Sequence, residues 1–221
     1  MAVTNMDSNS APDSAIPTKP TAVLNTPNLI TLTRFALSIV VFALMSYGFY
    51  YSSFWIFVIA ASTDWVDGYI ARRTDQVTQL GRILDPFCDK MIICGVYILI
   101  AIEAAQLTNP HWSLITGWMA VVVVGRELLV TMLRGYIEQR GGDFSANKAG
   151  KLKMVFQCIA VGGCLLVLAM ESSTDTFAIL IGWITGIAVW VAIVSTIYSG
   201  IIYIFAATKM VQGLTNHTNA N

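Results

Sequence analysis

Charged side chains are scarce in this chain of 221 residues, because Asp, Glu, Lys and Arg together make up only 12% of it. A soluble globular domain carries about a quarter of its residues as charged side chains, so the composition argues against a soluble protein. Hydrophobic residues make up 56% of the chain, and the mean hydropathy is +0.66. A helix that crosses a bilayer needs roughly 20 mostly apolar residues. The chain therefore has room for several such helices and for no large soluble domain.

Histidine and cysteine are also rare, which removes the most common metal ligands and nucleophiles. The two histidines, His111 and His217, fall in a predicted loop and in the C-terminal tail, where we expect solvated side chains. No cysteine shows the C-x-x-C spacing of a metal site. We expect small buried thiols and no disulfide framework for the four cysteines, Cys88, Cys94, Cys158 and Cys164.

The first 26 residues lack an apolar run, so we expect no signal peptide there. They are rich in Ser, Thr, Pro and Asn, and they contain Asp7, Asp13 and a single cation, Lys19. The acidic residues also argue against a transit peptide. We expect residues 1–26 to form a disordered cytoplasmic tail.

Six apolar stretches follow this tail and predict an all-α fold, a polytopic membrane bundle of six transmembrane helices. Before the first stretch, Asn28–Arg34 is either a short interfacial helix or the first turns of the first span. We expect the membrane domain to cover residues 27–209 and a C-terminal tail to cover residues 210–221. The predicted spans are Phe35–Tyr50, Phe54–Arg73, Gly81–Glu103, Trp112–Glu138, Lys148–Met170 and Phe177–Ala207.

The distribution of Lys and Arg predicts how the bundle lies in the membrane. The links after the first, third and fifth stretches contain none of the 13 cations. Because cytoplasmic loops retain Lys and Arg, both termini and the remaining links should face the cytoplasm, with the protein in the inner membrane. Aromatic residues at the cation-free ends fit a belt at the opposite membrane surface: Tyr47, Tyr50, Tyr51, Trp55 and Trp112.

Four aspartates gather where the second stretch turns into the third. Asp64 and Asp67 are three residues apart, and Asp85 and Asp89 are four apart, so each pair shares one helical face. A tight turn between the two helices would bring the acidic faces together. Carboxylates in a partly dry site repel one another unless cations neutralise them, and ligand sets made only of oxygen favour Mg²⁺ or Mn²⁺. The four acids suffice for two ions, an arrangement that serves phosphoryl transfer.

The string D-x-x-D-G-x-x-A-R-(x8)-G-x-x-x-D-x-x-x-D, which begins at Asp64 and ends at Asp89, resembles the signature of CDP-alcohol phosphatidyltransferases, with every position filled. The resemblance extends from about Asn28 to Lys209. It implies that the four aspartates hold two metal ions, that Asp89 is also the general base, and that the protein is a homodimer. It further implies that the donor, CDP-diacylglycerol, is bound by Asn28, Thr31, Gly68, Arg72, Thr78 and Gly81.

Two later segments concern the acceptor alcohol. Gly125–Val130, with Arg134 beyond it, and Ala146–Met154 resemble the fourth and fifth helices of the phosphatidylglycerophosphate synthases within that family. This resemblance implies transfer of a phosphatidyl group to glycerol 3-phosphate with release of CMP. Because glycerol 3-phosphate carries close to two negative charges, clustered cations suit it. We expect it to be bound by Arg126, Arg134, Lys151 and Lys153.

Several alternatives stay open at this point. A sibling enzyme of the family, such as a cardiolipin synthase, would use phosphatidylglycerol as acceptor. A divalent-cation carrier would also place acids inside the membrane, but it predicts acids spread across the membrane depth rather than gathered at one end. A scaffold has no need of four matched acids. For three cations we favour simple contact with lipid phosphates: Arg140, Lys148 and Lys209.

Overall fold

The computed structural model describes residues 26–74, 79–107, 112–139, 148–171, 173 and 175–218. Within these residues every regular element is a helix, which confirms the predicted all-α fold with six helices. The helices are α1 (Thr26–Ser46), α2 (Tyr50–Thr74), α3 (Gln79–Gln106), α4 (Gly117–Gln139), α5 (Lys148–Ala169) and α6 (Thr176–Thr218).

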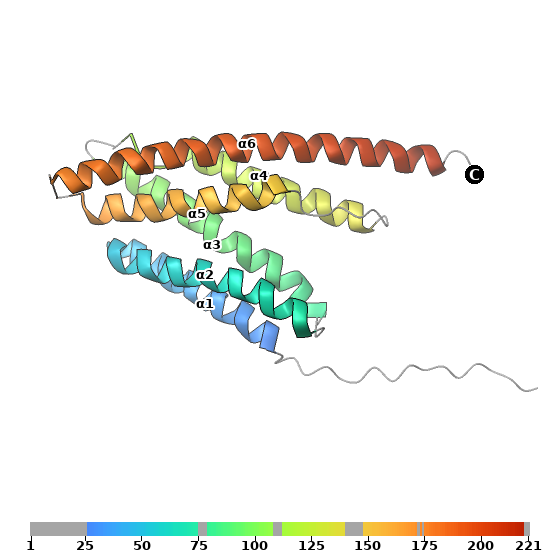
Figure 1. The fold of residues 1–221 in the computed structure, drawn as a ribbon, viewed down its shortest axis with the longest axis horizontal. Coiled ribbons are helices and arrows are strands. Elements are labelled where there is room, and N and C mark those ends of the chain that lie inside the picture. Colours follow the sequence, from blue (N-terminus) through green and yellow to red (C-terminus); the bar gives the residue numbers. More distant parts are fainter. Residues whose placement is uncertain are drawn as a thin grey trace, which may run out of the picture.

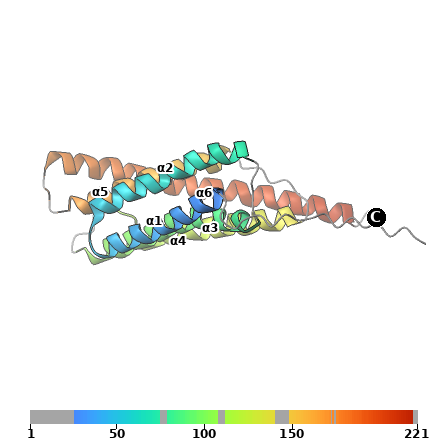
Figure 2. The same ribbon diagram turned by 90° about the horizontal axis from the view of Figure 1, so that it is seen from below.

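The six helices run up and down along the long axis of the molecule (Figure 1). At one end α1, α3 and α5 finish and α2, α4 and α6 begin; we call it the neutral end, because its links contain no Lys or Arg. At the opposite end, which we call the basic end, α2 and α4 finish and α3 and α5 begin. Both views show α6 extending past the other helices at the basic end (Figures 1 and 2).

The helices pack in two groups that share a core. α1 contacts α2 and α3, whereas α6 contacts α4 and α5, and contacts of α2 with α5 and of α3 with α4 and α5 join the groups. The shared core contains fully buried Met45, Phe57, Tyr97, Ile100 and Leu165. These large apolar side chains hold the neutral half of the bundle together, since the burial of apolar surface is the main favourable term in packing.

The outer surface is apolar as well. Large hydrophobic side chains are exposed on all six helices, and examples such as Val121 and Phe205 are each 71% exposed. A helix that is hydrophobic all round lies in a membrane or in the core of a large protein. By length and composition, two described helices are long and apolar enough to cross a membrane, over Leu152–Ala169 and Thr176–Thr208. Leu32–Ser46 and Tyr50–Ser62 are shorter apolar helices.

A left-handed glycine makes the sharp turn between α1 and α2. Gly48 has φ +77°, and its N–H donates to the carbonyl oxygen of Met45 at 2.9 Å, while the N–H of Phe49 donates to that of Leu44 at 2.9 Å. This pair of bonds satisfies the last carbonyls of α1 in a Schellman motif. The turn reverses the chain within a few residues, so α2 returns alongside α1.

The structure decides between the two alternatives for Asn28–Arg34 and moves several predicted boundaries, among them the start of α4 and the end of α6. Asn28–Arg34 forms the first turns of α1 rather than a separate interfacial helix. α4 begins at Gly117 and not at Trp112, because the carbonyl oxygen of Thr116 accepts the first helical bond of that helix, from the N–H of Ala120. α6 continues to Thr218, past the end of its apolar part. Hydropathy alone does not mark these positions.

Candidate functional site

The predicted acidic pairs lie on two consecutive helices. Asp64 and Asp67 are in the last three turns of α2, and Asp85 and Asp89 are in the first three turns of α3, so the backbone brings both pairs toward the basic end. Their side chains lie outside the described part of the structure. The same holds for the side chains of Asn28, Thr31, Gly68, Arg72, Gly81 and Lys151, and Thr78 lies outside the described residues altogether.

A metal site therefore stays a prediction from the sequence. Among residues whose side chains are described, no group of three His, Cys, Asp or Glu residues gathers closely enough to hold an ion. The backbone still agrees with the predicted donor set, since the spacing of three in α2 and of four in α3 keeps each acidic pair on one face.

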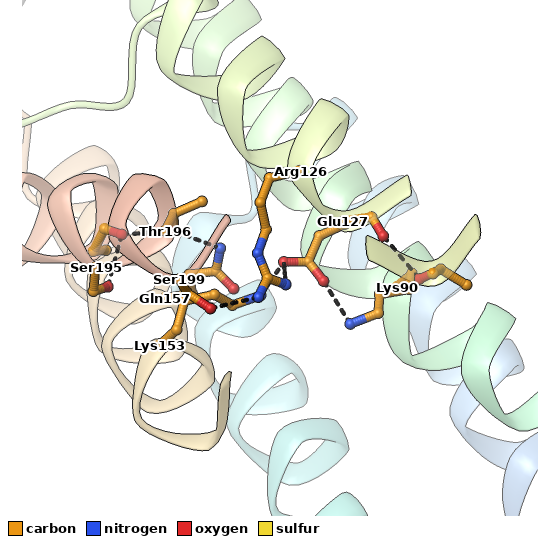
Figure 3. A network of polar contacts seen from close by, with 10 residues as sticks. Lys90, Arg126, Glu127, Lys153, Gln157, Ser195, Thr196 and Ser199 are labelled. Carbon is orange, nitrogen blue, oxygen red and sulfur yellow. Dashed lines mark hydrogen bonds and ion pairs between the residues drawn. The ribbon is translucent and has the colours of Figure 1, made fainter. Parts of the chain in front are cut away.

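A second polar cluster is described in detail, and it centres on a buried carboxylate. Glu127 of α4 is 1% exposed. One of its oxygens accepts a hydrogen bond from the ammonium group of Lys90 of α3 at 2.5 Å, and the other accepts one from Lys153 of α5. Figure 3 shows Lys90 approaching Glu127 from the side opposite Arg126. The carboxylate thus ties three helices together near the basic end.

Arg126 extends this cluster to α6. Its Nη1 lies 3.2 Å from Glu127 Oε1, and its Nη2 donates a hydrogen bond of 2.6 Å to the hydroxyl oxygen of Ser199 (Figure 3). The guanidinium carbon lies 5.4 Å from the centre of the Tyr203 ring, a distance at which the ring attracts a cation. Its Nε is buried without a hydrogen-bond partner in the described part of the chain. The guanidinium group of Arg126 thus contacts Glu127, Ser199 and Tyr203, and its Nε–H has no hydrogen-bond partner among the described residues.

Among the described side chains, the cluster carries an excess of positive charge. Three cations, Lys90, Arg126 and Lys153, surround one carboxylate, which leaves two positive charges without a described counter-ion. The side chains of Arg126 and Lys153 are 9% and 3% exposed, so water screens them poorly. A buried excess of this kind is costly unless an anion compensates it. The arrangement is suited to an anion with two negative charges.

One turn deeper, a neutral polar pair continues the cluster. The amide nitrogen of Gln157 donates to the hydroxyl oxygen of Thr196 at 3.1 Å, and that hydroxyl donates to the carbonyl oxygen of Ala192 at 2.7 Å. Gln157 is 1% exposed and lies four residues after Lys153 on α5. This pair fixes α5 against α6 directly below the cations, and no sequence spacing indicated it.

An apolar cavity of about 920 Å³ lies between α2, α5 and α6. Its wall includes Ser62, two residues before Asp64, and Met154, the residue after Lys153. Most of the remaining lining is apolar, with side chains such as Phe57, Ile159 and Leu166. The cavity therefore extends from the level of the polar groups toward the neutral end.

The predicted acceptor residues do not all meet. The structure brings Arg126 and Lys153 together around Glu127. Arg134 lies eight residues further along α4, about 12 Å at 1.5 Å per residue, and its Nε is buried without a hydrogen-bond partner among the described residues. Lys90 of α3 joins the cluster as well, although the sequence pattern assigned it no role in acceptor binding. The pairing is invisible in sequence spacing, because it crosses from α3 to α4.

Comparison with known proteins shows which family and which enzymes this chain is similar to. Residues 24–198 match the sequence model of the family described as CDP-alcohol phosphatidyltransferase. The chain is similar to the CDP-diacylglycerol–glycerol-3-phosphate 3-phosphatidyltransferase of Bacillus subtilis, with 34% identity over 80% of this chain and 92% of that protein. The proteins of that name from Pseudomonas fluorescens and Escherichia coli are 34% and 32% identical, over 72% and 64% of this chain and 80% and 76% of theirs.

Proposed function

Because this chain belongs to the CDP-alcohol phosphatidyltransferase family, we propose that it transfers the phosphatidyl group of CDP-diacylglycerol to glycerol 3-phosphate and releases CMP. The resemblance of the signature to that family is confirmed. The names of the similar proteins agree on this donor and this acceptor. The observation that carries the proposal is the cluster around Glu127, in which the described side chains place three cations about one buried carboxylate. A phosphate monoester supplies the matching negative charge.

The acidic ends of α2 and α3 form the donor side of the proposed site. A set of four carboxylates without His or Cys fits Mg²⁺, and also Mn²⁺, so Asp64, Asp67, Asp85 and Asp89 would hold two such ions. When bound, the ions neutralise charge on the pyrophosphate of the donor and on the leaving CMP. The CDP part of the donor would contact the residues predicted for it from the resemblance: Asn28, Thr31, Gly68, Arg72, Thr78 and Gly81.

The apolar cavity provides a place for an acyl chain of the donor. Its volume of about 920 Å³ is within the range of ligand pockets, and its lining is mostly apolar. Ser62 in its wall is two residues before Asp64 on α2, and Met154 in its wall follows Lys153 on α5. A lipid held there would present its headgroup to both halves of the site.

The proposed reaction is a direct transfer. Arg126 and Lys153 hold the phosphate of the acceptor, with Arg134 and Lys151 as further predicted contacts. Asp89 removes the proton from the free hydroxyl of glycerol 3-phosphate. The resulting oxygen attacks the phosphatidyl phosphorus, a new P–O bond forms, and the bond to the CMP oxygen breaks. The main contribution of the protein is to position two substrates and to compensate charge.

We place the site at the cytoplasmic surface of the inner membrane. The exposed apolar side chains on all six helices support a bundle surrounded by lipid, and the cation-free links support the neutral end as the outer one. All six helices would then cross the membrane, with both termini in the cytoplasm. Homodimer formation stays a prediction from the family resemblance.

One assay tests the function against its alternatives. The purified protein is incubated with CDP-diacylglycerol, Mg²⁺ and either glycerol 3-phosphate or phosphatidylglycerol, and the release of CMP is measured. We expect release with glycerol 3-phosphate. Release of CMP with phosphatidylglycerol as the acceptor, and none with glycerol 3-phosphate, would show a cardiolipin synthase instead. No release with either alcohol, combined with Mg²⁺ uptake into proteoliposomes, would show a cation carrier.

A further inference from the structure

Glu127 lies at the centre of the cation cluster, yet the proposed reaction gives it no chemical step. Its carboxylate is buried and accepts hydrogen bonds from Lys90 of α3 and Lys153 of α5. A carboxylate repels a phosphate, so Glu127 itself is no ligand for the acceptor. Its contacts instead determine where the ammonium groups lie.

We propose that Glu127 is a positioning residue that holds Lys90, Lys153 and Arg126 as one binding surface for the acceptor phosphate. This inference rests on the proposed function. It also adds Lys90 to the acceptor site. Lys90 follows Asp89 directly on α3, so its placement connects the helix of the proposed base to the cations of α4 and α5.

The two lysines need such a partner for physical reasons. Lysine is a flexible side chain, and ordering it is entropically unfavourable. Lys153 is 3% exposed, and a buried ammonium without a partner is strongly disfavoured. Without the carboxylate, both ammonium groups would turn toward water and away from Arg126, because three cations repel one another.

The donors of the cluster are still available to a ligand. An ammonium group has three N–H donors, and in the described part of the chain Glu127 is the acceptor of both lysines. The side chain of Lys90 is 35% exposed, which makes it the most accessible of the three cations. An acceptor phosphate that enters from the basic end would meet Lys90 first and the more buried Lys153 and Arg126 next.

The main test compares two identical chemical changes in the full-length protein. Glu127→Gln removes the central carboxylate, whereas Glu103→Gln removes a carboxylate that accepts a 2.8 Å hydrogen bond from Tyr50 and belongs to the neutral end. Misplacement of binding groups by on the order of 1 Å can cost a hundredfold, so we expect Glu127→Gln to raise the KM for glycerol 3-phosphate about tenfold or more. The KM for CDP-diacylglycerol should stay unchanged, and Glu103→Gln should behave as wild type.

Conservative and double variants separate positioning from a structural role. Glu127→Asp retains the charge and should restore part of the affinity for glycerol 3-phosphate. The double variant Lys90→Met with Glu127→Gln tests whether Glu127 acts through Lys90. If it does, the increase in the KM for glycerol 3-phosphate is smaller in the double variant than the product of the increases in the two single variants. Multiplicative single effects would overturn the inference, as would an unchanged or lowered KM in Glu127→Gln.

Failure of the proposed function and failure of a variant to fold can each be told apart from failure of this inference. If the wild-type protein releases no CMP with glycerol 3-phosphate, the proposed function itself fails. If Glu127→Gln does not fold, as judged by size-exclusion chromatography in detergent, Lys90→Met alone decides the matter, since this side chain is partly exposed. A tenfold higher KM for glycerol 3-phosphate would then support the inference, and an unchanged KM would overturn it.

Discussion

Arg126→Lys retains the positive charge at the acceptor site and removes the planar fork that the surrounding residues hold. The guanidinium reaches Glu127 and Ser199 with two different nitrogens, and it also lies over the Tyr203 ring. An ammonium group is a single point and cannot satisfy this geometry. The substitution therefore tests whether the site uses the shape of the arginine or only its charge.

The magnitude follows from the contacts that are lost. A hydrogen bond to a charged group contributes about 1.5–3 kcal/mol, and Arg126→Lys removes the 2.6 Å bond to Ser199. Part of the attraction to the Tyr203 ring remains, because lysine can also bind an aromatic face. A net loss of about 2 kcal/mol in transition-state binding corresponds to a roughly thirtyfold lower kcat/KM, since each 1.36 kcal/mol is tenfold.

The assay is steady-state CMP release at varied glycerol 3-phosphate, with CDP-diacylglycerol saturating in mixed micelles. Ser199→Ala removes the same hydrogen bond from the partner side, so it should lower kcat/KM by a comparable factor. Arg140→Lys makes the same chemical change at a cation that we expect only to contact lipid phosphates, and it serves as the control. Wild-type kcat/KM in Arg126→Lys would refute a role for the guanidinium geometry.

Three further predictions concern other parts of the molecule. Asp89→Asn should abolish turnover while CDP-diacylglycerol still binds, and near-wild-type turnover would exclude Asp89 as the base. Removal of divalent ions with EDTA should stop CMP release and added Mg²⁺ should restore it; activity in excess EDTA would contradict the metal site. Gly163→Ala places a methyl group 2.5 Å from Thr185 Oγ1, so this overpacking should destabilise the bundle by about 1–3 kcal/mol. Gly135→Ala, with nothing within 4 Å of the added carbon, is the control in thermal unfolding, and equal midpoints would contradict tight α5–α6 packing.

Hydropathy predicts the six helices of this chain, although among the described residues only α5 and α6 contain an apolar run long enough to cross a membrane. It fails at the start of α4, where the turn before the helix contains buried Leu114 and Ile115 and so has the composition of a span. It also fails at the end of α6, where the helix continues to Thr218 through polar residues. Hydropathy detects apolar runs, whereas backbone hydrogen bonds set helix ends, and a helix that leaves the apolar layer has no hydropathy signal.

The residues of the candidate site also fall into some that the sequence predicted and some that it did not. Arg126 and Lys153 were predicted together because the surrounding segments resemble a known branch of the family, and the structure brings them to one carboxylate. Lys90, Ser199 and Tyr203 were not predicted, since their contacts with Glu127 and Arg126 join residues of different helices. Such contacts depend on helix rotation and register, which a single sequence without a spacing rule does not determine.

The register of α3 and α5 explains how the proposed sites for the lipid donor and for the phosphate of the acceptor come to lie side by side. α3 carries Asp89 on the proposed donor side and, one residue later, Lys90 in the cation cluster. α5 carries Lys153 in that cluster and, one residue later, Met154 in the wall of the apolar cavity. A shift of either helix by one turn, about 5.4 Å, would separate the cations from the acids or from the lipid. The Lys90–Glu127–Lys153 bridge opposes that shift, because it links α3 and α5 to the same carboxylate of α4.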